Sequence, residues 1–373
     1  MYGLVLAGGG ARGAYEVGAW RGVQELGIEI GAICGTSIGS INGAVFAQGD
    51  GETAEKLWRE ISAADILDMT GLSDEKLFSL KNIGAVFEEF KKNKGLSMAP
   101  LEELLRNIVN EDKLMLSPVD FGLVTYSLTD FAETEIFKAD IPRGKLVDYL
   151  MASACLPGIK TKVIDDKAFV DGFVADNKPI SMLVKKGYRD IISVDVGGFG
   201  IVKHVPPEGV NIINIRCASP MVGVLEFDSN RIADSIQTGY LDTKRAFGVI
   251  SGSKYAIRTA DYNRTKKRIS QELLDGLEFA AELLGVDMLK EYSVTSLARA
   301  VMKEYRRLLK ENTTLSIESI LNAKDKNSAI LLAKAAEAVS GGNGELLTGR
   351  FVSSVFKGIA RAVNAVLYFS DKV

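Results

Sequence analysis

The sequence is poor in the residues on which several common kinds of active site depend. It contains one histidine, His204, and three cysteines, Cys34, Cys155 and Cys217, among 373 residues. A Ser-His-Asp triad would have to use that histidine, which lies in the loop sequence V-K-H-V-P-P with no catalytic pattern around it. The cysteines are scattered among apolar residues, so they indicate neither a disulfide framework nor a zinc site. A serine nucleophile in this chain would therefore need a carboxylate as its base.

Charge and hydrophobicity exclude further classes of protein. The net charge of −3 at pH 7 argues against broad nucleic-acid binding. No apolar run is long enough to span a bilayer. The first ten residues, M-Y-G-L-V-L-A-G-G-G, lack the basic region and the long apolar core of a signal peptide. We therefore expect a cytoplasmic protein, long enough for two domains or for one domain with an extension.

The most informative stretch is a G-x-S-x-G pentapeptide in which Gly35 and Gly39 flank Ser37. The apolar residues 28–34 before it predict a strand, and the pattern of residues 38–45 after it predicts a helix. Strand, sharp turn and helix form the context in which this motif presents a nucleophilic serine. The glycines would let the strand and the helix pass closely, and the helix N-terminus would favour negative charge at the turn. The alternative is a tight turn in which the serine only caps the helix.

A second glycine-rich turn follows a strand predicted for residues 2–7. Gly8, Gly9 and Gly10 begin the sequence G-G-G-A-R-G, which leads into a helical pattern over residues 15–26. Backbone N–H groups gathered at the start of a helix suit an anion.

Three interpretations of this glycine loop remain open. It matches G-x-G-x-x-G, so a dinucleotide site is possible, with Glu29 near the distance of a ribose ligand but at the start of the second strand rather than its end. A P-loop is excluded, because no G-K-[ST] follows. The loop could instead be an oxyanion hole, since two neighbouring parallel strands would bring both glycine turns to one edge of the sheet. It could also have only a structural role.

The rest of the chain alternates between strands and helices up to about residue 216, which predicts an α/β sheet with helices on both faces. A charged, mainly helical insertion is expected over residues 50–115. Within it, residues 69–95 are either a surface segment or a movable cap over an acyl site. Asp171 and Gly172 form a D-G turn after a predicted hairpin, and such a turn is by itself typical of an Asx-turn.

These pieces together resemble the patatin-like phospholipases. The family pattern is a G-G-G-x-[RK]-G loop, a G-x-S-x-G elbow, an A-S-x-x-x-P segment and a D-G-[GA] turn leading to D-N-x-P. Here the four motifs occupy, in the same order, residues 8–13, 35–39, 152–157 and 171–179. Four motifs in register are far more specific than any one of them.

The resemblance covers about residues 2–200 and implies a fold. We expect a patatin-like α/β/α sandwich with a mainly parallel central sheet over residues 1–219. Residues 220–373 are expected to form a helical C-terminal extension, because their pattern is that of charged amphipathic helices. The apolar side of residues 351–369 would pack within a helical layer or, alternatively, lie on a membrane surface.

The resemblance also implies roles for individual residues. Ser37 would be the nucleophile and Asp171 its base, in a dyad without histidine. Gly8, Gly9 and Gly10 would supply the oxyanion donors.

Five more residues would support these motifs, namely Arg12, which would shape the glycine loop, with Gly13, Gly35, Gly39 and Gly172. Phe173 departs from the family pattern, which has glycine or alanine there. Its ring could dry and narrow the site, or it could mark a lineage with altered substrate or weak activity.

The implied function is a serine-dependent lipid acyl hydrolase of the phospholipase A, lysophospholipase or esterase type. Its partners would be a lipid ester and, peripherally, a membrane surface, with no nucleic acid, cofactor or metal. An acyltransferase on the same dyad is the nearest alternative. A non-catalytic lipid- or nucleotide-binding relative is another.

Overall fold

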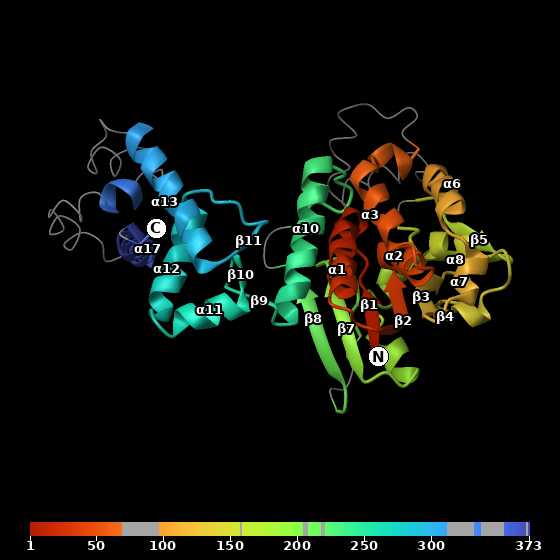
Figure 1. Cartoon of the computed structure of the whole chain (residues 1–373). Coiled ribbons are helices and arrows are strands. Elements are labelled where there is room, and N and C mark those ends of the chain that lie inside the picture. Colours follow the sequence, from red (N-terminus) through yellow and green to blue (C-terminus); the bar gives the residue numbers. More distant parts are fainter. Residues whose placement is uncertain are drawn as a thin grey trace. The chain divides into compact units, whose positions relative to one another are not determined.

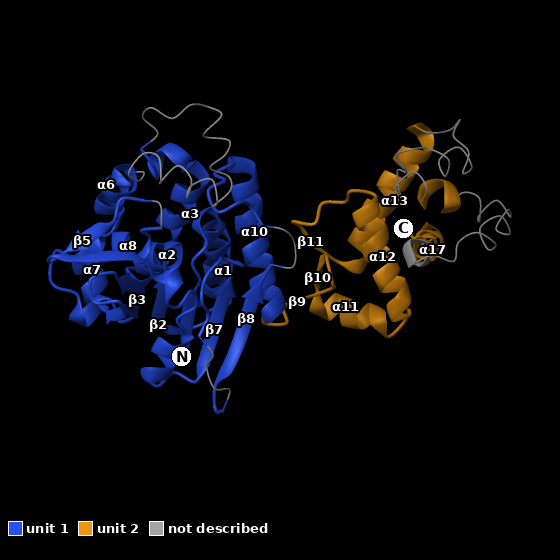
Figure 2. Cartoon of the chain, turned by 180° about the vertical axis from the view of Figure 1, so that it is seen from behind, with its two compact units in different colours: residues 1–246 blue, residues 247–373 orange. Residues whose placement is uncertain are grey.

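The computed structural model shows the chain as two compact units, residues 1–246 and 247–373 (Figures 1 and 2). The residues that it describes are 1–68, 97–156, 159–203, 208–217, 221–311, 332–336, 354–370 and 372–373. His204 and the segment 69–95, for which a cap was one interpretation, lie outside the described residues.

The first unit is built on a mainly parallel sheet, as the sequence predicted (Figure 1). Its strand order is β5-β6-β3-β2-β1-β7-β8, and β4 pairs with β3 outside this path. The parallel strands are β1 (Tyr2–Leu6), β2 (Ile30–Thr36), β3 (Asp120–Ser127), β7 (Asp190–Asp195) and β8 (Asn211–Arg216). The strands with antiparallel pairing are β4 (Ala132–Phe137), β5 (Lys162–Ile164) and β6 (Lys167–Asp171). Because β1, β2 and β7 run in one direction, the turns that follow them meet at one edge.

Both faces of this sheet are covered, because successive side chains of a strand point to opposite faces. On one face Leu6 and Ile33 lie beside α2 (Ile38–Ala47), close to its Gly43. On the other face Val5 packs in a buried cluster with residues of α9 (Ile180–Lys185). This two-sided burial explains why the sequences of β1 and β2 read as nearly continuous apolar runs.

The other helices described in the first unit lie in segments for which the sequence predicted helices, although it assigned the last of them to the C-terminal extension. They are α1 (Gly13–Glu25), α3 (Gly51–Glu60), α6 (Ala99–Ile108), α7 (Glu111–Leu116), α8 (Leu146–Ser153) and α10 (Ser229–Ala246). The described parts of the expected insertion, α3, α6 and α7, are helical.

The first unit ends at Ala246 rather than at the expected residue 219, because α10 packs closely on α1. Glycines allow this approach: a Cβ at Gly18 of α1 would lie 1.8 Å from the carbonyl oxygen of Ile236. A Cβ at Gly239 of α10 would lie 2.0 Å from the carbonyl oxygen of Tyr15. Nothing in the local sequence of α10 distinguishes it from the helices of the second unit.

The second unit has a core of its own. The helices with described bounds are α11 (Thr259–Lys266), α12 (Gln271–Leu283), α13 (Val294–Glu311) and α17 (Ser354–Ser370). A small sheet of β9 (Ile250–Ser251), β10 (Ala256–Arg258) and β11 (Glu291–Tyr292) accompanies them, which the sequence did not predict.

From Ile359 onwards the apolar side of α17 is buried inside this unit, so this part of the helix does not support the alternative of a membrane-surface helix. Residues 351–353 and the side chains of residues 354–357 lie outside what the structure describes. Ile359, Val363 and Val366 belong to one buried cluster with Leu277 of α12 and Leu297 of α13. A helix whose apolar side is already covered has no such side to offer to lipid. Across the described ranges, no helix combines the length and the apolar character needed to cross a membrane.

Gly18→Ala tests the packing of α10 on α1. The added methyl group would overlap the backbone of α10, so we expect a loss of about 3 kcal/mol in the free energy of unfolding of the first unit. Asp234→Ala, at an exposed position of α10, is the matched control and should change it by less than about 0.5 kcal/mol. Urea unfolding followed by circular dichroism measures both, and equal midpoints for the two variants would contradict this packing.

Candidate active site

The register of the sheet brings the predicted site residues together. Thr36, next to Ser37, pairs with Val124 of β3, and the adjacent Thr125 pairs with Asp171 of β6. The end of β6 therefore lies beside the end of β2, although more than a hundred residues separate them in the chain.

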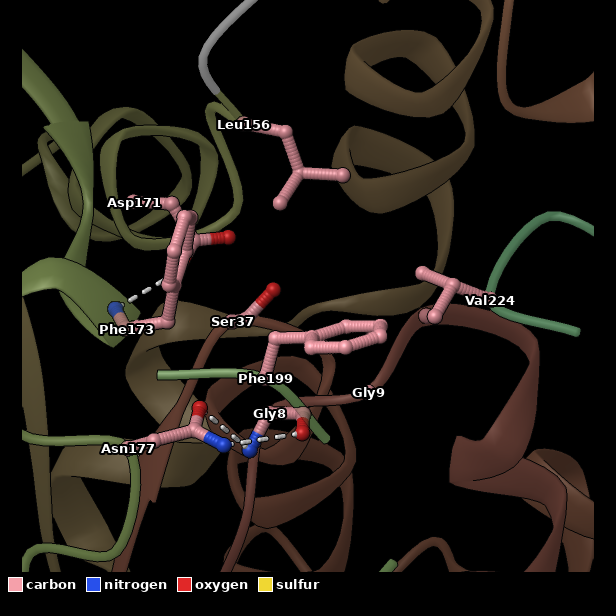
Figure 3. A pocket seen from close by; sticks show the side chains of 10 residues that line it. Gly8, Gly9, Ser37, Leu156, Asp171, Phe173, Asn177, Phe199 and Val224 are labelled. Atoms are coloured by element: carbon pink, nitrogen blue, oxygen red, sulfur yellow. Dashed lines mark hydrogen bonds between the residues drawn. The ribbon is translucent and has the colours of Figure 1, made fainter. Parts of the chain in front are cut away.

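One small cavity collects these residues (Figure 3). Its volume is about 20 Å³, which is room for a water molecule but not for an acyl chain. The residues that line it are Gly8, Gly9, Gly10, Ser37, Leu156, Asp171, Phe173, Asn177, Phe199 and Val224.

Ser37 occupies a strained turn between β2 and α2. Its φ of 55° and ψ of −128° lie in a region that residues with side chains rarely adopt. The turn is held by Ser153, whose Oγ accepts the N–H of Ser37 at 2.9 Å and donates to the carbonyl oxygen of Val124 at 2.7 Å. This hydrogen-bonded chain fixes the backbone of Ser37 to the neighbouring strand.

The glycines of the pentapeptide are required by close backbone contact. A Cβ at Gly35 would lie 2.3 Å from the carbonyl oxygen of Gly39, and a Cβ at Gly39 would lie 2.4 Å from that of Leu6. Contacts below 3 Å with backbone atoms cannot be relieved by moving a side chain, so only glycine fits. Gly172 beside Asp171 is restricted in the same way, at 2.3 Å from the carbonyl oxygen of Val124.

Asp171 is fully buried at the end of β6. Its Oδ1 accepts the N–H of Phe173 at 2.9 Å, and its N–H donates to the carbonyl oxygen of Cys155 at 2.8 Å. Its Oδ2 is buried and has no hydrogen-bond partner within the described part of the chain. A buried carboxyl oxygen without a donor is costly, and in a cavity such a group is a candidate for function.

Burial raises the pKa of Asp171 to about 7, and the Ser37 hydroxyl and the Phe173 N–H oppose this rise. The Ser37 hydroxyl thus lies near enough to the carboxyl to favour its ionised form, although the two side chains make no hydrogen bond of normal length. In Figure 3 the Ser37 hydroxyl and the Asp171 carboxyl project into the same cavity. The two predicted dyad residues are therefore neighbours in the folded chain.

The N–H groups of the glycine loop differ in whether the protein itself uses them. The N–H of Gly8 is taken up by Asn177, through its Oδ1 at 3.1 Å and its carbonyl oxygen at 3.3 Å. The Asn177 amide in turn donates to the carbonyl oxygen of Gly8 at 3.2 Å. Gly8 is therefore not available as an oxyanion donor. No described residue accepts the N–H of Gly9 or Gly10, and both glycines line the cavity.

Arg12, to which the resemblance gave the role of shaping this loop, donates hydrogen bonds to backbone carbonyls. Its Nε donates to Val222 at 2.9 Å, and its Nη1 donates to Gly197. The neighbouring Ala11 N–H donates to the carbonyl oxygen of Val224 at 2.7 Å. The segment around residue 224 thus fixes the loop from outside the region covered by the family motifs.

Gly13 has a packing role at the start of α1. A Cβ there would lie 2.5 Å from the side chain of Ile38 in α2. The absence of a side chain lets α1 begin directly beside the serine turn.

Apolar side chains wall the cavity, and Phe173 is one of them, together with Leu156, Phe199 and Val224. A ring at residue 173 fits the interpretation of a dry and narrow site. Sequence reasoning missed Phe199 and Val224, which belong to no motif. It also gave no role to Ser153 and Asn177, although both lie inside motifs that it had identified.

The dinucleotide interpretation of the glycine loop is not supported. Glu29, its ribose ligand, precedes β2 and accepts the N–H of Tyr2 through its backbone at 2.8 Å. It therefore lies at the start of β1 and β2, whereas Gly8 and Ser37 lie at the opposite ends of these strands.

Comparisons with known proteins cover the region of the motifs. Lysophospholipase NTE1 of Cryptococcus neoformans is 32% identical over 209 residues, which make up 52% of this chain and 11% of that protein. Patatin-like phospholipase domain-containing protein 7 of Rattus norvegicus is 29% identical over 201 residues, 52% of this chain and 13% of that protein. The chain thus spans about a tenth of the length of these curated relatives.

Among solved structures, VipD from Legionella pneumophila aligns with a TM-score of 0.42 at 14% identity, over 98% of this chain and 88% of that one. A family model described as patatin-like phospholipase matches residues 4–184, which include the glycine loop, the serine turn and Asp171. Over residues 4–184, the resemblance of this chain to the patatin-like phospholipase family is therefore confirmed.

Proposed function

We propose that this chain is a serine-dependent lipid acyl hydrolase in which Ser37 is the nucleophile and Asp171 its base. The observation that carries the proposal is the shared cavity, in which a hydroxyl on a strained turn faces a buried carboxyl with one unpartnered oxygen. The match to this family supports a lipid ester as the substrate. The name of the fungal relative, a lysophospholipase, supports an ester of a phospholipid.

Acylation would begin with proton transfer from the Ser37 hydroxyl to Asp171 as the serine oxygen attacks the ester carbonyl. The free N–H groups of Gly9 and Gly10 would bind the developing oxyanion, at about 3 kcal/mol for each donor. The N-terminus of α2 adds a favourable field for negative charge at residue 37. The protonated carboxyl then gives its proton to the leaving alcohol, and the acyl group stays on Ser37.

Deacylation would repeat these steps with water. The water oxygen attacks the acyl carbonyl while Asp171 takes a proton from the water. Asp171 then returns a proton to the oxygen of Ser37 as the fatty acid leaves. A pKa of about 7 suits this role, because an ordinary aspartate is a weak base for an alcohol. An acyltransferase would differ only in the acceptor of this second stage.

Ser37→Ala and Asp171→Asn test the dyad. Each should lower ester hydrolysis roughly 10³-fold or more, because one removes the nucleophile and the other its base. A fluorophosphonate probe should label Ser37 in the wild type and in neither variant. Asp166→Asn, at an exposed position of the same hairpin, is the matched control and should keep full labelling.

The outcome against the dyad is full hydrolysis or full labelling in either folded variant. If the wild type itself is not labelled, a non-catalytic relative becomes the better description. Competition between water and an added alcohol for the acyl-enzyme then separates hydrolysis from acyl transfer.

The activity should depend on pH through the ionisation of Asp171. Only the carboxylate can accept the serine proton, so kcat/KM should rise with pH and level off above an apparent pKa of about 7. Phe173→Ala admits water beside the carboxyl and should move this limb to lower pH. A profile that stays flat from about pH 5 to about pH 8, a range that spans this pKa, would argue against Asp171 as the base.

The same pKa predicts that stability falls as pH rises, whereas activity increases. The folded state holds the Asp171 proton more tightly than the unfolded state, so its burial lowers stability as pH rises from 3.8 to about 7. Asp171→Asn removes this loss and should stabilise the fold, by an amount that grows over this range and is constant above it. Thermal unfolding of both proteins across pH measures the difference, and a difference that does not vary with pH would refute the shift.

A further inference from the structure

The turn after β7 carries a group of exposed apolar side chains. Phe199 is 61% exposed, Ile201 55% and Val202 48%. Elsewhere in the described residues, no stretch of four positions carries three large exposed apolar side chains. Three of them within four positions form a patch of the kind that marks an interaction site. We call these residues, 199–202, the apolar turn.

The backbone of the apolar turn is fixed, so the exposure of its side chains is imposed by the fold. The N–H of Ile201 donates to the carbonyl oxygen of Phe173 at 2.9 Å, and its carbonyl oxygen accepts the N–H of Asn177 at 2.6 Å. Just before the turn, Gly198 packs so closely that a Cβ there would lie 1.8 Å from the carbonyl oxygen of Gly8. The segments next to Asp171 and the glycine loop therefore fix the backbone of this turn, and its apolar side chains remain exposed to solvent.

The apolar turn is continuous with the candidate active site. Phe199 is largely exposed and yet lines the cavity of Ser37. Figure 3 shows its ring beside Ser37, on the side toward Val224. A cavity of about 20 Å³ cannot admit an acyl chain unless a wall moves. Of the apolar wall residues, Phe199 also belongs to the exposed patch, so an acyl chain that crosses the patch meets its ring first.

The charges around the turn favour an uncharged partner surface. Lys203 is the one basic residue in 197–203, and its ammonium group pairs with Glu133 and lies 3.8 Å from Glu135. The Arg12 guanidinium nearby is engaged by the carbonyl oxygens of Val222 and Gly197. Attraction to anionic lipid depends on basic side chains that are free to approach the head groups, and this turn presents apolar ones instead.

We infer that the apolar turn is the surface by which this chain docks on a neutral phospholipid bilayer, an inference that rests on the proposed function. Phe199, Ile201 and Val202 enter the boundary between head groups and acyl chains. Phe199 is the point where the bilayer meets the cavity of Ser37. A lipid therefore passes to the nucleophile without crossing open water.

The test measures binding to phosphatidylcholine vesicles by co-flotation, with the full chain in a Ser37→Ala background so that no turnover is needed. Ile201→Ser combined with Val202→Ser should weaken partitioning roughly tenfold, because both side chains leave the bilayer. Leu116→Ser is the matched control, since Leu116 is 86% exposed just before β3, at the opposite edge of the sheet. Adding phosphatidylserine should not strengthen the binding.

A second measurement does not depend on weakening the interaction. Val202→Trp should shift its emission to shorter wavelength on addition of vesicles and be quenched by brominated acyl chains. The two native tryptophans, Trp20 and Trp58, are buried and give a constant background. Wild-type partitioning in the double serine variant, or an unshifted Val202→Trp spectrum, overturns the docking surface.

The outcomes separate this inference from the proposed function. Vesicle binding through the apolar turn without any ester hydrolysis would support docking and count against the dyad alone. Hydrolysis of a monomeric water-soluble ester without any vesicle binding would support the dyad and overturn docking.

Discussion

The chemistry proposed for this chain depends on one carboxyl group that the fold keeps away from water. Asp171 is fully buried, and no basic side chain is among the causes of its pKa shift. A buried carboxylate without a cation is destabilising, so the proton is held up to about pH 7. This loss of stability occurs at the position that the proposed mechanism assigns to the general base. Sites that lower stability in this way are expected where function, rather than packing, has determined the residue.

Hydrogen bonds between side chains and backbone groups hold the rest of the site together across distant segments. Ser153 holds the strained turn of Ser37, and Asn177 holds Gly8 across 169 positions of sequence. The carbonyl oxygens of Val222 and Val224, which lie beyond the segment 4–184 that matches the family, accept from Arg12 and from the N–H of Ala11 and complete the loop. Polar side chains thus serve mainly to fix backbone geometry, and the groups left free are those proposed to act on the substrate.

The two compact units differ in what they offer to a lipid. In the second unit the apolar side of α17 is buried against its neighbours from Ile359 onwards, as expected of a core helix. In the first unit the exposed apolar residues 199–202 lie on a backbone that is bonded to the site itself. An amphipathic pattern shows which side of a helix is apolar, but not whether that side packs against protein or against lipid. Only the contacts in the folded chain distinguish a core helix from a membrane-surface helix.

The sequence by itself determined the α/β fold and the two glycine turns, because these features are encoded in local patterns of glycine spacing and apolar runs. The pairing of Ser37 with Asp171 was implied only by the resemblance of four motifs to the patatin-like family, since a D-G turn alone is typical of an Asx-turn. Only the tertiary structure decided that Gly8 is engaged by Asn177, that α10 belongs to the first unit, and that Phe199 reaches the cavity of Ser37. These outcomes depend on backbone groups and methyl-sized gaps between segments far apart in the chain. Such contacts leave no periodic signal in the residues that make them, so they become visible only when the segments are placed side by side.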